Sequence, residues 1–196
     1  MMVKEVILLK VISVIGTTGC GKTHQCAELV EELTSVAENK PPSEGNLPMV
    51  LSLGKIFRGM FGDDFFTTQS NPSTSEATEL LARALIHYSV QISSRYNKDL
   101  IIDGFPRSVS QLEYLMDTVK NLSRSGLEIR LICSNEEEQW KRLKNREEHL
   151  GCELDREFYL RKMITDATQI AALISVYKQR IGTDRFFTYT EVDNLG

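Results

Sequence analysis

The chain has 196 residues, a length that suits one α/β domain with small inserted subdomains. Hydrophobic residues make up 41% of it and charged residues 26%, which is ordinary for a globular protein, and the formal net charge of -4 gives no electrostatic basis for binding nucleic acid. No run approaches the roughly 18 consecutive apolar residues of a membrane-spanning helix, and no sorting signal is visible, so the predicted compartment is the cytoplasm.

The first predicted elements are a buried strand over Val11 to Ile15 and a glycine-rich loop that follows it at once. Residues 16–23 read G-T-T-G-C-G-K-T, which matches the phosphate-binding pattern G-x-x-x-x-G-K-[ST] between a strand and a helix. Glycines let such a backbone fold around an anion, and the free N–H groups and dipole of the next helix attract phosphate. The alternative is a glycine-rich turn that binds nothing, which requires strand, spacing and helix to coincide by chance.

We expect this loop to hold the phosphates of ATP. Lys22 would bridge the terminal phosphates, and the Thr23 hydroxyl would reach Mg²⁺, which is the predicted cofactor. His24 falls on the first turn of the following helix, where its side chain either touches phosphate or stays exposed. The predicted ATP-binding residues are Gly16, Thr17, Thr18, Gly19, Cys20, Gly21, Lys22, Thr23 and His24.

Helix-like and strand-like segments alternate along the rest of the chain. This alternation predicts a mostly parallel sheet covered by helices, with ligands at the carboxyl ends of the strands. The predicted fold class is therefore a three-layer α/β/α domain of the phosphate-loop type over residues 1–196. The expected helices after the loop cover 25–36, 53–61, a segment from Ser73 or Ser75 to Arg95, 108–122, 136–146 and 155–180, and the expected strands cover 49–53, 100–102, 129–133 and 186–189.

The four cysteines indicate neither a disulfide framework nor a zinc site. Cys20, Cys26, Cys133 and Cys152 form no C-x-x-C pair and do not cluster with the three histidines. We therefore expect reduced cysteines that act as small apolar or surface residues.

A second motif follows the predicted strand at residues 100–102. Asp103 ends that strand, where a phosphate-loop enzyme places the acidic residue that orders Mg²⁺ and its waters. The next residues, Gly104-Phe105-Pro106-Arg107, supply a tight turn and a fixed cation, and Gln111 follows four residues later. This segment resembles the Asp-Gly-Phe/Tyr-Pro-Arg signature of adenylate kinases and related nucleoside monophosphate kinases. The resemblance implies that Asp103 serves the metal, that Arg107 binds phosphate and that Gln111 recognises adenine.

The resemblance covers most of the chain. Residues 51–58 look like the segment that opens the monophosphate-binding subdomain of the family, here expected as a helical insertion over 54–95, and Arg58 falls on its phosphate-binding arginine. Leu53 stands where a threonine commonly contacts the adenosine. The spacing Arg142-x-x-x-Arg146 resembles the start of a mobile lid, expected as a short lid over 146–156. The implied catalytic residues are Lys22, Arg107, Arg142 and Arg146; the implied AMP-binding residues are Leu53, Arg58, Arg107 and Gln111; the implied metal ligands are Thr23 and Asp103.

The lid departs from the pattern of the family. Cys152 stands where short-lid members carry an arginine, and the position of the next lid arginine falls on Met163. Arg156 or Arg161 replaces the missing charge only if the helix register is shifted, because two residues rotate a helical side chain by about 200°. The inner face of that helix is expected to include Phe158, Met163, Ala167, Ile170 and Ile174.

Three functions follow from these observations. The first is an adenylate kinase that transfers the γ-phosphoryl group of Mg-ATP to AMP, with UMP or CMP as the alternative acceptor. The second is a nucleotide-binding regulatory domain that keeps the fold and has lost most transfer activity. The third is a phosphate-loop ATPase or a kinase for another small acceptor. The expected partners are ATP and AMP, without nucleic acid or membrane, in a monomer or in one domain of a longer chain.

Overall fold

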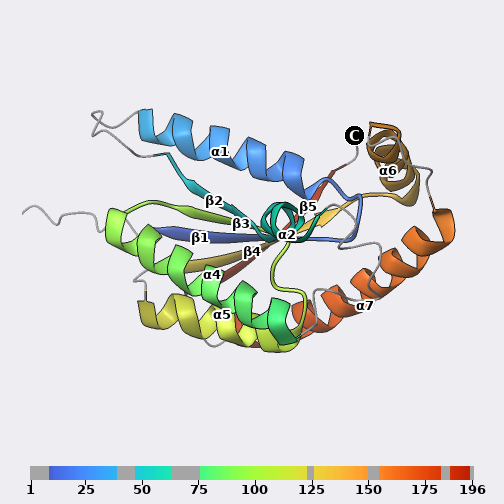
Figure 1. Ribbon diagram of the computed structural model, residues 1–196. Coiled ribbons are helices and arrows are strands. Elements are labelled where there is room, and N and C mark those ends of the chain that lie inside the picture. The colour runs from blue at the N-terminus through green and yellow to red at the C-terminus, as the bar shows by residue number, and fades with distance from the viewer. Residues whose placement is uncertain are drawn as a thin grey trace, which may run out of the picture.

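The computed structural model describes residues 9–38, 47–62, 76–122, 126–149, 155–181 and 186–194. Five strands form one parallel sheet in the order β2-β3-β1-β4-β5, with helices on both faces (Figure 1). The predicted fold class, an α/β domain with a central parallel sheet, is thereby confirmed. In chain order the elements are β1 (Lys10–Ile15), α1 (Lys22–Glu38), β2 (Met49–Ser52), α2 (Leu53–Phe61), α4 (Glu76–Tyr96), β3 (Leu100–Asp103), α5 (Val109–Leu122), β4 (Gly126–Cys133), α6 (Glu136–His149), α7 (Arg156–Ile181) and β5 (Phe187–Asp193).

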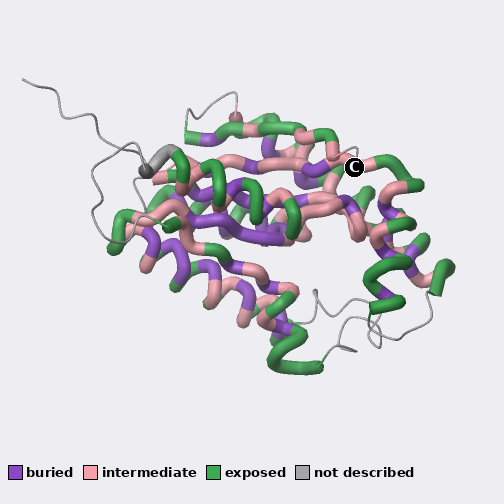
Figure 2. The backbone as a smooth tube through the Cα atoms, turned by 90° about the horizontal axis from the view of Figure 1, so that it is seen from above, coloured by how far each residue is buried: buried purple, intermediate pink, exposed green. Residues whose placement is uncertain are grey.

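The central strand β1 separates two hydrophobic cores. Val11 and Ile15 face a large cluster that includes side chains of α4, α5 and α7. Ile12 and Val14 face a second cluster built with α1. Figure 2 shows the resulting buried interior between more exposed outer helices. Because β1 is covered on both faces, its sequence does not alternate between apolar and polar residues. Its one buried polar residue, Ser13, donates its hydroxyl to the Phe105 carbonyl.

The long helix α7 belongs to two different cores. Leu173 and Tyr177, in its second half, lie in the large cluster, and the Tyr177 hydroxyl donates to the Leu127 carbonyl at 2.8 Å. Tyr159 and Met163, in its first half, form a separate small cluster with Leu143 of α6. None of the residues 164–172 between these halves is buried. The structure therefore has a small α6–α7 core beside the core of the sheet.

Several element boundaries differ from those expected. The helix after the glycine-rich loop begins at Lys22, three residues early, because the loop turns directly into it. Strand β4 begins at Gly126 rather than at residue 129, in register with Lys10 of β1. The charged residues Glu128 and Arg130 hide this strand in the sequence, and the structure pairs them at 2.6 Å.

Parts of the predicted subdomains lie outside the described residues. The expected insertion at 54–95 contains most of α2 and nearly all of α4, but residues 63–75 are not described. The expected lid at 146–156 contains the end of α6 and the first residue of α7, but residues 150–154, with Cys152, are not described. The division into subdomains therefore stays a prediction. None of the described helices is both long enough and apolar enough to cross a membrane.

Candidate functional site

The glycine-rich loop lies at the carboxyl end of β1, the middle strand of the sheet. At two of its glycines a side chain would strain the loop. A Cβ atom on Gly16 would lie 2.5 Å from the Cys20 sulfur, and one on Gly21, whose φ is +98°, would lie 2.1 Å from Asn194 Nδ2. The glycine spacing is thus required by the tight path of the loop into α1.

Lys22 closes over the loop that precedes it. Its ammonium donates to the carbonyl oxygens of Gly16 at 2.8 Å and Thr17 at 2.7 Å. The Thr17 hydroxyl in turn donates to Gln139 Oε1 at 3.1 Å, which ties the loop to α6. A lysine in this place has its charge at the mouth of the loop, where the terminal phosphates of a nucleotide would lie.

Arg142 of α6 binds backbone carbonyl groups of the phosphate loop. Its guanidinium donates to the carbonyl oxygens of Cys20 at 3.2 Å and Gly19 at 3.5 Å. Asn194, after β5, donates to the same Cys20 carbonyl at 3.1 Å and accepts from Arg142 at 3.3 Å. The predicted catalytic Arg142 is therefore placed on the loop's carbonyl groups, a position from which it holds the loop in shape.

The two predicted metal ligands lie next to one another. Asp103 ends β3, which pairs with β1 so that Asp103 is opposite Val14. Its carboxylate accepts from the Thr23 hydroxyl at 3.4 Å and from the Ser52 hydroxyl at 3.0 Å. Carboxylate and hydroxyl oxygens suit Mg²⁺, which usually takes few protein ligands and completes its shell with phosphate oxygens and water. The residues present fit the predicted ion; Ser52, which the sequence did not single out, is marked only by its place at the end of β2.

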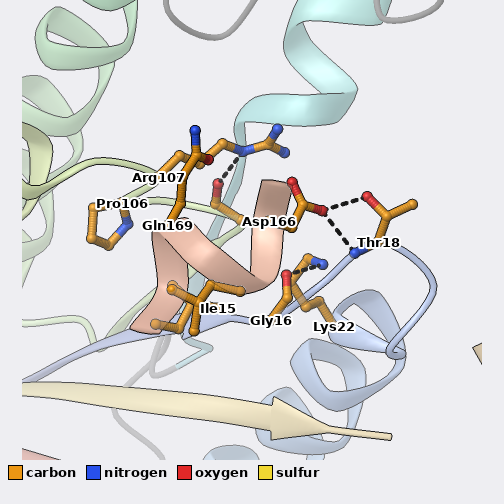
Figure 3. A pocket seen from close by; sticks show the side chains of 10 residues that line it. Ile15, Gly16, Thr18, Lys22, Pro106, Arg107, Asp166 and Gln169 are labelled. Atoms are coloured by element: carbon orange, nitrogen blue, oxygen red, sulfur yellow. Dashed lines mark hydrogen bonds between the residues drawn. The ribbon is translucent and has the colours of Figure 1, made fainter. Parts of the chain in front are cut away.

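Arg107 lines the same pocket as Gly16, Thr18 and Lys22 (Figure 3). Its Nε donates to the Gly104 carbonyl at 3.1 Å, which fixes the side chain against its own turn. Arg107, the arginine predicted to bind the acceptor phosphate, therefore lies in one pocket with the phosphate loop.

Gln111 is hydrogen-bonded to the backbone of Arg107. Its carbonyl oxygen accepts from the Arg107 backbone N–H at 2.7 Å, and its amide nitrogen donates to Glu79 of α4. The side chain is 3% exposed. One end of the amide thus binds the turn before α5 and the other end binds α4, so both ends have protein partners at the predicted adenine contact.

Three further predicted nucleotide contacts do not line this pocket. Leu53 is buried in the large core at the start of α2, and Arg58 is exposed in the last turn of that helix. His24 is 68% exposed and lies 3.4 Å from Glu28 on α1. None of the three is among the pocket-lining residues.

Arg146 joins α6 to α7. Its guanidinium contacts the Glu147 carboxylate at 3.0 Å and the Tyr159 hydroxyl, which itself donates to Glu147 at 2.6 Å. Burial, followed by the hydrogen bond to Glu147, raises the pKa of Tyr159 to about 12. The predicted catalytic Arg146 thus belongs to a hydrogen-bonded group with Glu147 and Tyr159 that links α6 to α7 beside the expected lid.

The arginines considered as replacements for the missing lid charge point elsewhere. Arg161 pairs with Glu157 at 2.8 Å on the exposed side of α7. Arg156 lies over the Trp140 ring, 5.3 Å from its centroid. Met163 packs in the small α6–α7 core.

Lys162 of α7 has its ammonium over the Phe158 ring, 5.7 Å from the centroid, and does not line the pocket. Burial lowers its pKa to about 8, and the positive charges of Arg107, Arg146 and Lys22 act in the same direction, opposed by Asp166. Lys162 therefore lies within electrostatic range of the phosphate site. The sequence could have indicated Lys162 through its helical spacing with Asp166 and Gln169, at i, i+4 and i+7.

Asp166 reaches the phosphate loop itself. Its Oδ2 accepts from the backbone N–H of Thr18 at 2.9 Å and from the Thr18 hydroxyl at 2.6 Å (Figure 3). Asp166 and Gln169 line the pocket, whereas Ala167, expected on the inner face of this helix, is exposed. The expectation was wrong for Ala167, because the helix crosses a polar site between its two cores. It was right for the other four residues, which pack in or against those cores: Phe158, Met163, Ile170 and Ile174.

Together, the sheet order, the loop at the end of its central strand and the Thr23–Asp103 pair define a phosphate-loop nucleotide-binding domain. The profile of the AAA domain family matches residues 15–157, and the chain belongs to that family. No curated protein matches it.

Among the solved structures that share the fold are three with TM-scores of 0.54 to 0.56. The Pnkp1/Rnl/Hen1 RNA repair complex contains a chain with a TM-score of 0.55 and 17% identity; the match covers 84% of this chain and 46% of the other, so this chain spans under half of that protein. Kti12 of Chaetomium thermophilum, in complex with ADP-AlF3, gives a TM-score of 0.54 at 17% identity over 79% of each chain. A suspected kinase of Chloroflexus aurantiacus gives 0.56 at 11% identity over 96% of this chain and 89% of the other. At these identities the likeness concerns the fold.

Proposed function

We propose that the chain is a nucleoside monophosphate kinase that transfers the γ-phosphoryl group of Mg-ATP to AMP and so makes two ADP. The observation that carries the proposal is that Arg107 and the phosphate loop line one pocket, beside the Thr23–Asp103 pair. A donor phosphate on the loop would face a fixed arginine that can bind an acceptor phosphate through its planar fork.

Phosphoryl transfer asks the protein mainly for alignment and neutralisation of charge. Lys22 would exchange its loop carbonyl contacts for the phosphates, and Thr23 and Asp103 would hold Mg²⁺. The ion, when bound, supplies positive charge on the phosphate oxygens. Lys162 would add a positive charge from the α7 side, the contribution for which the sequence offered Arg156 or Arg161.

The choice of AMP rests on the resemblance of residues 51–58 and 103–111 to adenylate kinases. Gln111 would be its base-recognising residue, but both ends of the Gln111 amide already have protein partners. Adenine recognition by Gln111 therefore requires that the bond to Glu79 be exchanged. UMP and CMP are the acceptors to compare with AMP.

A nucleotide-binding regulatory domain with little transfer activity is the second candidate. It is favoured by the positions of Arg142 and Arg146, which bind loop carbonyls and Glu147 rather than face the pocket. Such a domain would bind ATP with the same loop and lack the clamp that speeds transfer.

The deciding experiment mixes the purified protein with Mg-ATP and AMP and measures ADP, with Lys22→Ala as the inactive control. AMP-dependent ADP formation above that control is the expected result, and UMP and CMP in parallel assays identify the acceptor. ATP binding by calorimetry without turnover would establish the regulatory domain instead. ATP hydrolysis that no monophosphate stimulates would replace both with an ATPase or a kinase for another acceptor.

A further inference from the structure

We propose that Asp166 is a built-in competitor of the terminal phosphate of the nucleotide, so that a triphosphate binds only by displacing this carboxylate from the loop. The proposal rests on the nucleotide-binding part of the proposed function and concerns the regulation of that site. It does not depend on the identity of the acceptor.

The contact itself has the form of an anion bound to the loop. One oxygen of Asp166 accepts two hydrogen bonds from Thr18, through the backbone N–H at 2.9 Å and the hydroxyl at 2.6 Å. Thr18 follows directly on Gly16 and Thr17, whose carbonyls hold the Lys22 ammonium. Since that lysine serves the terminal phosphates in loops of this kind, the Thr18 donors lie where the end of a triphosphate would bind.

The charges around the carboxylate strengthen the competition. Asp166 lines the pocket together with Lys22 and Arg107, and its charge also acts on Lys162. Without nucleotide, the Asp166 carboxylate offsets part of the repulsion between these cations. A triphosphate offsets it with more negative charge, and it repels a carboxylate that stays in contact with the loop. Phosphate and carboxylate are therefore alternatives at Thr18.

The position of Asp166 along α7 lets the contact open. The helix is anchored at Met163 in the small core and at Leu173 in the large core, and no residue from 164 to 172 is buried. Release of the carboxylate from Thr18 exposes no fully buried apolar side chain of this stretch. The main loss would be two hydrogen bonds, which bound phosphate oxygens can replace.

The test is the binding of ATP, ADP and inorganic triphosphate to Asp166→Asn, by calorimetry with and without Mg²⁺. Asparagine keeps the shape and an acceptor oxygen but loses the charge. ATP and inorganic triphosphate should bind roughly tenfold more tightly than to the wild type, with a smaller gain for ADP. Glu157→Gln is the matched control, because it removes one negative charge from an exposed site on the same helix, and it should leave the affinities unchanged.

Two results would overturn the proposal. If Asp166→Asn binds ATP equally well or more weakly than the wild type, the carboxylate does not compete with phosphate. If its affinity falls only in the presence of Mg²⁺, Asp166 is a metal ligand instead. Both results leave the proposed kinase reaction standing when the wild type makes ADP from AMP.

Amide exchange tests the contact without nucleotide. The Thr18 amide should exchange at least severalfold faster in Asp166→Ala than in the wild type, and equal rates would show that Asp166 does not protect it. Tighter ATP binding by Asp166→Asn in a protein that transfers no phosphoryl group would support the competitor and remove the kinase assignment. Failure of both wild type and Asp166→Asn to bind any of these phosphates would remove both.

Discussion

The strand ends and the α6–α7 pair place charged side chains around the phosphate loop in different ways. At the strand ends, Asp103 meets Thr23 because β1 and β3 are adjacent and in fixed register. On the α6–α7 side, Arg142 and Arg146 bind loop carbonyls and Glu147, while Asp166 of α7 contacts the loop and Lys162 lies within electrostatic range of it.

The difference lies in what fixes a side chain's direction. The end of a parallel strand always lies at the same edge of the sheet as the ends of its neighbours, so residue type and order suffice to place Asp103. A helical side chain turns by about 100° with each residue, and its direction depends on how the whole helix packs. Chemistry at strand ends is therefore readable in the sequence, whereas chemistry on helix faces needs the structure.

The largest expected effect is at the strand ends. Asp103→Asn should lower phosphoryl transfer by roughly 10³-fold, because a bound Mg²⁺ supplies several kcal/mol of transition-state stabilisation. Steady-state ADP formation over a range of Mg²⁺ concentrations measures it. Ser52→Ala, which removes the other hydroxyl bonded to Asp103, should cost less than about tenfold. Equal losses in the two variants would contradict the assignment of Asp103 as the ligand.

On the α7 side, Lys162→Met should lower kcat by about 100-fold, as removal of one preorganised charge does elsewhere. Lys162→Arg should restore most of the rate. Arg161→Met is the matched control, one residue away on the exposed side of the helix, and should change kcat less than twofold. A larger loss of kcat from Arg161→Met than from Lys162→Met would show that Arg161, and not Lys162, replaces the missing lid arginine.

The pH dependence of ATP binding tests the contribution of Lys162 in a second way. Burial lowers the pKa of Lys162 to about 8, and the charges of Arg107, Arg146 and Lys22 lower it too, whereas Asp166 raises it. A bound phosphate would raise that pKa toward its ordinary value of 10.5, so binding takes up a proton between these values. The Lys162 contribution to affinity is complete below about pH 8 and falls as the pH rises. Calorimetry in buffers of different ionisation enthalpy should detect proton uptake near pH 9 in the wild type and much less in Lys162→Met.

The sequence predicted the sheet, the phosphate loop and the Thr23–Asp103 pair because each depends on local pattern and strand order. It did not predict Lys162 or Asp166, because a lysine and an aspartate on a charged helix look like solvated residues until the packing of α7 is known. Nor did it predict the hydrogen bond from the Gln111 amide to Glu79, because Glu79 lies on a helix about 30 residues away in the chain.

The smallest expected effect separates the two cores of α7. Tyr159→Phe removes a hydroxyl between Glu147 and Arg146, and Tyr177→Phe removes one bonded to the Leu127 carbonyl; each should cost about 1–2 kcal/mol. If the α6–α7 core opens separately from the sheet, Tyr159→Phe should speed amide exchange in α6 and the first half of α7 while the amides of β1 keep their protection. Tyr177→Phe should instead weaken the protection of the sheet and lower the global free energy of unfolding in urea. Equal loss of protection across the molecule in both variants would mean that the two cores unfold as one unit, and that Asp166 cannot leave the loop without loosening the sheet.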